Sequence, residues 1–135
     1  MMEVNVKLLD DVKFEIGSRN HTVVSDQPQQ NGGHDEGMTP PELFLASLGS
    51  CAAFYASAYL RKKGLPREGV EVRVTAEKAG PPARLDNFTI EVKIPLPLSE
   101  ADRLGIDQAI HHCVIHNTML HPPTIKIELH TPIAV

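Results

Sequence analysis

The chain has 135 residues, a formal net charge of −4, and only 4% aromatic residues with no tryptophan. This length suits one domain with its own core, so we expect a single domain over residues 1–135. The sequence has no long basic run and few aromatic side chains for base stacking, which argues against nucleic acid and anionic membranes as partners. Two cysteines in a chain without an export signal are typical of the reducing cytoplasm, where we expect the protein.

The N-terminal part is predicted to form short antiparallel strands. Apolar and polar residues alternate in three stretches, the pattern of strands with one buried face: 2–8, 12–16 and 21–25. Arg19 lies in the turn between the second and third stretches. From its position alone, Arg19 is expected to be a solvated turn residue.

Residues 26–38 lack periodicity and are rich in glycine, which predicts a long loop. The run His34-Asp35-Glu36 within it offers metal-ligand side chains. Three adjacent residues seldom converge on one ion, so we expect them to be solvated.

The stretch 43–60 carries no charge, is crowded with alanine and serine, and repeats apolar residues at helical spacing. Thr39 and Glu42 form a T-x-x-E capping box, which predicts the start of a helix. Basic residues 61–63 and the following Gly64 predict its end. Eighteen uncharged residues reach the lower limit for a membrane span, but the stretch is only weakly apolar. We therefore expect a central helix buried on nearly all sides.

The C-terminal half alternates strands and helices. Strict alternation predicts two further strands, and a serine N-cap at Ser99 predicts a second helix, followed by a short helical turn and a last strand. The segments are 70–76 and 88–96 for the strands, 99–113 and 114–120 for the helices, and 125–129 for the last strand. Strands with one polar face indicate a mainly antiparallel sheet with a long central helix and a second helix on its other face. The fold class is therefore α+β.

Cys51 and Cys113 both fall on apolar faces of predicted helices. Free cysteines at such positions are often small buried hydrophobes. Small residues leave room beside Cys51, and Cys113 sits at a predicted helix start, where the pKa of a thiol falls. A redox role for the pair therefore remains open beside the structural one.

The run His111-His112-Cys113, with His116 beyond it, offers zinc ligands. Structural zinc sites need four ligands, usually as two close pairs, and the second pair is missing here. Adjacent histidines also diverge on a helix. The sequence thus predicts no metal and no cofactor.

The run Gly37-Met38-Thr39-Pro40-Pro41-Glu42-Leu43, eight residues before Cys51, resembles the G-x-x-P-x-E-L signature of the OsmC/Ohr family. The segment around Cys113 and the order of strands are similar to that family over nearly the whole chain. Two positions differ from many members: Pro41 replaces a glutamate and Val114 replaces a proline. These differences resemble the OsmC-like branch.

The resemblance implies an intertwined homodimer with two active sites at its interface. It implies that Cys51 attacks an organic hydroperoxide, that Cys113 resolves the sulfenic acid as a disulfide, and that Arg19 favours the thiolate. The expected partners are a second copy, the hydroperoxide and a dithiol reductant such as a lipoylated protein. The alternative is a non-enzymatic binding protein that uses the same interface pocket for a small ligand.

Overall fold

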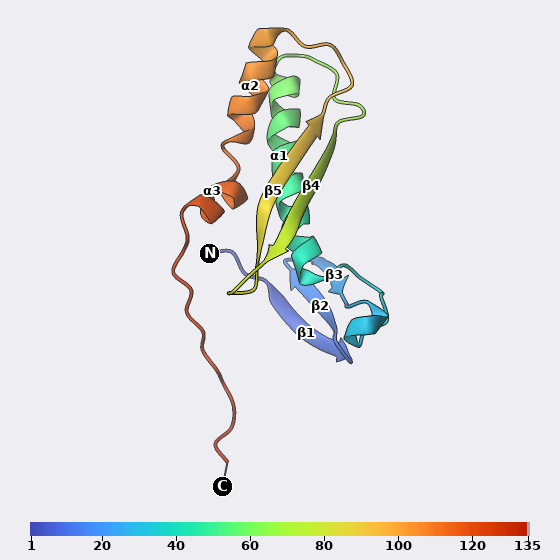
Figure 1. Ribbon diagram of the computed structural model, residues 1–135, viewed down its shortest axis with the longest axis vertical. Helices are drawn as coiled ribbons and strands as arrows, with labels where there is room; N and C mark the ends of the chain where they lie inside the picture. The colour runs from blue at the N-terminus through green and yellow to red at the C-terminus, as the bar shows by residue number, and fades with distance from the viewer. Residues whose placement is uncertain (135) are drawn as a thin grey trace.

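The computed structural model describes residues 1–134, and its fold class is α+β, as expected (Figure 1). The strands are β1 (Asn5–Asp10), β2 (Lys13–Ser18), β3 (His21–Ser25), β4 (Glu71–Ala79) and β5 (Arg84–Lys93). The helices are η1 (Gln29–Asn31), α1 (Pro40–Lys62), α2 (Glu100–Ile110) and α3 (Val114–Leu120). All strand pairs in the ladders are antiparallel, but they form two sheets, β1-β2-β3 and β4-β5, instead of one.

The three-stranded sheet follows from the alternation in the sequence. Val6 pairs with Ile16 and Leu8 with Phe14, so apolar side chains share one face across β1 and β2. Val6 and Leu8 remain 58% and 64% exposed, however, because in the described part of the chain β2 is the one strand beside β1 and no element covers its apolar face. This sheet lies at the N-terminal end of α1 (Figure 1).

The start of α1 is the predicted capping box. The backbone N–H of Glu42 donates to Thr39 Oγ1, and the Glu42 carboxylate accepts from the backbone N–H of Thr39 at 2.9 Å. Glu42 is thus engaged in capping. The helix ends at Lys62, within its predicted basic end.

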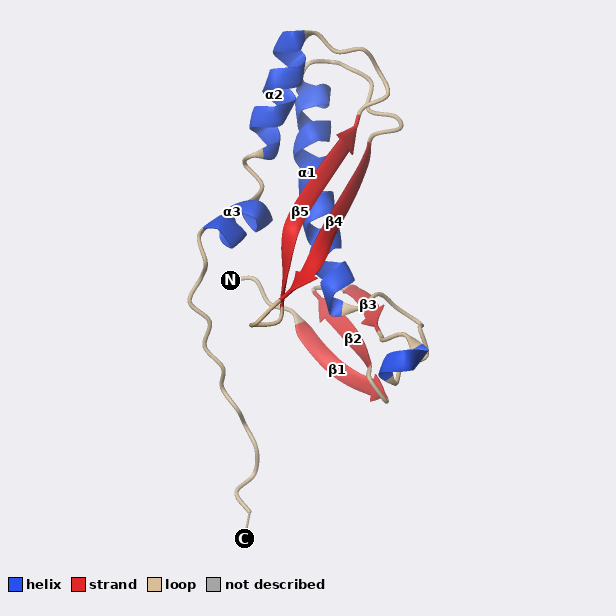
Figure 2. Ribbon diagram, viewed as in Figure 1, coloured by secondary structure: helices blue, strands red, loops and turns tan. Residues whose placement is uncertain are grey.

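The expectation that α1 is buried on nearly all sides is wrong for the single chain. Among the described residues, the fully buried side chains of α1 lie four apart on one face: Leu48, Ala52, Ala56 and Leu60. Phe54 is 64% exposed on another face. The reason is that the narrow β4-β5 sheet and α2 cover one side only (Figure 2). By length and composition alone α1 could cross a membrane, a test that the core helix of a globular protein also passes.

The main core lies where α1, α2 and the β4-β5 sheet meet. Ala56 and Leu60 of α1 pack with Ile106 of α2, and apolar residues of β5 and the following loop surround them. The helix α3 begins at Val114, fourteen residues after the first residue of α2, and packs on α1. This packing carries the segment around Cys113 back to the middle of α1.

The last predicted strand does not form. Residues 121–134 run away from the body without a ladder partner, and Ile125, Ile127 and Leu129 are 79%, 90% and 87% exposed (Figure 2). The alternation at 125–129 describes a strand with one apolar face, but a strand also needs a neighbouring edge for its N–H and C=O groups. Within the described chain this segment reaches no such edge.

Candidate active site

The two cysteines are brought together by α1, α2 and α3. Cys51 lies in the middle of α1 and is half-buried, whereas Cys113 follows α2 and is only 2% exposed. Both are free thiols. Although sixty-one residues separate them in sequence, the Cys113 thiol is near enough to affect the ionisation of Cys51.

The environment of Cys51 acts on its pKa in both directions. Burial raises the pKa of Cys51 most, and hydrogen bonding with the Cys113 thiol raises it further. The backbone N–H groups of Ile115 and Val114 lower it, and the net effect is a raised pKa. The site therefore already supplies two donors to a Cys51 thiolate, but within residues 1–134 no positive charge is among the groups that shift its pKa towards the thiolate.

Cys113 is held by the first turn of α3. It is the N-cap residue of this helix, and the backbone N–H of His116 donates to its Sγ atom at 3.4 Å. The prediction that Cys113 lies where one helix ends and another begins is confirmed. Backbone N–H groups from the first turn of α3 thus donate to both sulfur atoms.

Aromatic and imidazole rings stand beside the cysteine pair. The Tyr55 ring, one turn after Cys51, lies 6.3 Å from the ring of His112 and 5.1 Å from that of Phe54, as measured between centroids. His111 instead interacts through Nδ1 with the carbonyl oxygen of Asp107 at 2.7 Å. The histidines in this run therefore face different neighbours, as expected for adjacent residues at a helix end.

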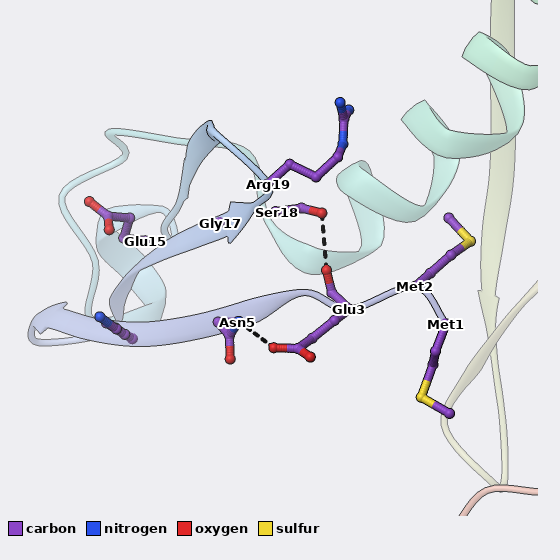
Figure 3. Close-up of a pocket in the computed structure, with 9 residues that line it drawn as sticks. Met1, Met2, Glu3, Asn5, Glu15, Gly17, Ser18 and Arg19 are labelled. Carbon is purple, nitrogen blue, oxygen red and sulfur yellow. Dashed lines mark hydrogen bonds between the residues drawn. The ribbon is translucent and has the colours of Figure 1, made fainter.

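Arg19 is placed in the turn between β2 and β3, with a left-handed φ of 55°. It lines an open hollow of about 630 Å³ together with Met1 and Met2, close to the hydrogen bond from Ser18 Oγ to the Glu3 carbonyl (Figure 3). This hollow is the largest of those described, but neither cysteine lines it, so its size does not mark the reactive centre. Within residues 1–134, Arg19 is also not among the groups that shift the pKa of Cys51. A single chain therefore assembles the two cysteines but not the predicted arginine.

Sequence reasoning missed the role of Asp26. Its side chain is fully buried at the start of the loop and accepts the backbone N–H groups of Gln27, His34 and Glu36 at 2.7, 3.2 and 3.1 Å. Burial raises the pKa of Asp26, but the three donors outweigh it and leave the pKa below its usual value. An aspartate that opens a glycine-rich loop is a signal for such a turn. Asp26 thereby fixes the loop that leads into α1.

Most of the fold and residues 33–128 of the sequence match known proteins. The family model described as OsmC-like protein matches residues 33–128, which include both cysteines. No curated protein matches the sequence. Two similar solved structures are an OsmC-like protein from Mycoplasma pneumoniae and a Psychrobacter arcticus 273-4 protein provisionally described as an osmotic stress induced and detoxification response protein.

The Psychrobacter structure has a TM-score of 0.79 at 21% identity, over 87% of this chain and 88% of that one. The Mycoplasma structure has a TM-score of 0.75 at 20% identity, over 90% and 89% of the two chains. At these identities the likeness concerns the fold.

Proposed function

The chain belongs to the family of OsmC-like proteins, and from this premise we propose that it reduces organic hydroperoxides with Cys51 and Cys113 as a redox pair. The observation that carries the proposal is the meeting of the two free thiols between α1 and α3, on backbone donors from one helical turn. A proposed role in detoxification also fits the provisional description of the Psychrobacter protein.

The proposed reaction has three steps. The Cys51 thiolate attacks the distal peroxide oxygen, the O–O bond breaks, and the leaving alkoxide takes a proton to become an alcohol, so that Cys51 becomes a sulfenic acid. The Cys113 thiol then displaces water from the sulfenic acid and forms a disulfide. A dithiol reductant, for which a lipoylated protein is suitable, reduces this disulfide by two thiol–disulfide exchanges and is itself oxidised to a disulfide.

The backbone donors have a specific part in the first step. The N–H groups of Val114 and Ile115 stabilise negative charge on the Cys51 sulfur, which the thiolate needs before attack. Burial opposes this by raising the pKa of Cys51. A positive charge near Cys51 would complete the site, and Arg19 is the proposed source.

We infer that a second copy supplies this arginine in a homodimer. Within residues 1–134, three apolar surfaces lack a partner: the face of α1 around Phe54, the exposed face of β1 and the segment 125–129. Apolar surface of this extent is uncommon on monomers. Sedimentation of a monomer at micromolar concentration would remove the dimer and the shared site with it.

Two serine variants test the cysteine roles. Cys113→Ser is expected to consume about one equivalent of cumene hydroperoxide and stop at the Cys51 sulfenic acid, because the resolving thiol is gone. Cys51→Ser is expected to consume essentially none. Mass spectrometry after one equivalent of peroxide reads out both, and rapid sulfenic acid formation in Cys51→Ser alone would reverse the roles.

The binding-protein alternative is favoured by one observation. A hollow of about 490 Å³ lies between β5 and α2, lined by apolar residues together with Arg103, His111 and His116. Neither cysteine lines it, so it is a different site from the interface pocket expected of a binding protein. Its size suits a small ligand. If neither thiol of the wild type is oxidised by a stoichiometric organic peroxide, this alternative replaces the peroxidase.

A further inference from the structure

The turn between β1 and β2 meets the loop 26–38 at a cluster of three metal-ligating side chains. Asp10 and Asp11 come from the turn and His34 from the loop, and one ligand atom of each lies within 4.8 Å of the other two. The Asp11 Oδ2 and His34 Nε2 atoms are 2.7 Å apart. All three side chains are exposed, so that an ion and its water ligands can reach them.

The charges of this cluster are not balanced. The Asp10 carboxylate has no hydrogen bond or ion pair within residues 1–134, although it stands within 4.8 Å of the Asp11 carboxylate. The cation nearest along the sheet is Lys13, which pairs with Asp10 in the β1-β2 ladder, but its Nζ atom binds Glu36 at 2.8 Å. Lys13 still attracts Asp10 electrostatically, but within residues 1–134 the ion pair made by this cluster is that between His34 and Asp11.

The position of His34 does not depend on the cluster itself. The buried Asp26 carboxylate accepts the backbone N–H of His34 at 3.2 Å, and the Lys13–Glu36 ion pair ties the next part of the loop to β2. Gly37 closes the loop against β3, where a Cβ atom would collide with the carbonyl group of Val24. The imidazole is therefore presented to the two carboxylates by contacts that involve none of them.

We propose that Asp10, Asp11 and His34 form a binding site for a divalent first-row transition metal ion such as Mn²⁺. Two carboxylate oxygens and one imidazole nitrogen suit this class of ion, and three protein ligands leave further positions for water. The ion replaces the proton shared by His34 and Asp11 and neutralises the second carboxylate. It joins the loop that leads into α1 to the β1-β2 turn.

The site is separate from the proposed redox chemistry, so each proposal can fail without the other. In the sequence His34 lies in the run His34-Asp35-Glu36, but the carboxylates that join it in the fold, Asp10 and Asp11, lie more than twenty positions earlier. Only the fold places them together.

Titration with Mn²⁺ followed by the electron paramagnetic resonance signal of the free ion tests the site. Mn²⁺ is the probe because the thiols and the histidine run near Cys113 favour softer metals such as Zn²⁺. His34→Gln and Asp10→Asn are each expected to weaken binding about tenfold or more, since loss of even outer-shell support costs metal sites this much. Asp35→Asn, a neighbour outside the cluster, is the matched control and should bind as the wild type does.

A second measurement needs no variant. In the wild type, substoichiometric Mn²⁺ is expected to broaden the amide resonances of Asp10, Asp11 and His34 before all others, and a chelator should restore them. The proposal is overturned if the wild type binds no Mn²⁺, if His34→Gln binds it equally well, or if broadening centres on another part of the chain.

Discussion

Replacement of Gly105 by alanine tests how α2 is seated on α1. Gly105 faces Tyr59, whose hydroxyl donates to Asp102 Oδ1 of α2 at 2.9 Å. A Cβ atom at position 105 would lie 2.5 Å from Tyr59 Cε2 and Cζ, well inside van der Waals contact. Burial and then the Asp102 contact raise the pKa of Tyr59, which agrees with a tightly held ring.

Two effects of Gly105→Ala oppose each other. Alanine favours a helix interior over glycine by about 1 kcal/mol. Against this, displacement of the ring costs about 1–3 kcal/mol through overpacking, and loss of its hydrogen bond costs about 1 kcal/mol. The cost of the clash is larger than the gain in helix propensity, so the free energy of unfolding should fall by about 1–3 kcal/mol. This lowers Tm by roughly 3–10 °C for a chain of this size.

Thermal and urea unfolding followed by circular dichroism measures this change. The control is Tyr59→Ala, in which the ring is absent and Gly105→Ala should be neutral or stabilise by up to about 1 kcal/mol. Because α2 leads directly to Cys113, Gly105→Ala should also slow formation of the Cys51–Cys113 disulfide. The clash would be refuted if Gly105→Ala destabilised the wild type and Tyr59→Ala equally. It would also be refuted if Gly105→Ala stabilised the wild type.

Three further predictions concern other parts of the chain. Thr39→Ala removes the N-cap oxygen of α1 and should lower the free energy of unfolding by about 1 kcal/mol in urea; an unchanged midpoint would contradict the cap. The contact with Asp11 raises the pKa of His34. The wild type should therefore be more stable than His34→Gln when both are measured with a chelator present. This difference in the free energy of unfolding should be full below pH about 6.5 and vanish as the pH rises through the raised pKa. An advantage that grows with pH would count against it. Burial and Cys113 raise the pKa of Cys51, so Cys113→Ala should lower the pH midpoint for alkylation of Cys51, and a higher midpoint would disprove this coupling.

The sequence by itself determined most of the local structure. The capping box at Thr39 and Glu42, the strand at His21–Ser25 and the helix at Val114–Leu120 all appear where the residue pattern predicts them. The OsmC-like family was also recognisable from the segment before Cys51. Caps, turns and alternation act between residues a few positions apart, so a linear pattern contains the information that specifies them.

Only the tertiary structure decided which segments meet. It seats Cys113 against Cys51, buries Asp26 beneath three backbone donors, and brings His34 to the β1-β2 turn. It also leaves one face of α1 uncovered and 125–129 without a ladder, where the pattern alone indicated a buried helix and a paired strand. An apolar face indicates that a segment packs against a neighbour. Which neighbour it packs against depends on how distant segments of the chain are arranged, and no local spacing encodes that.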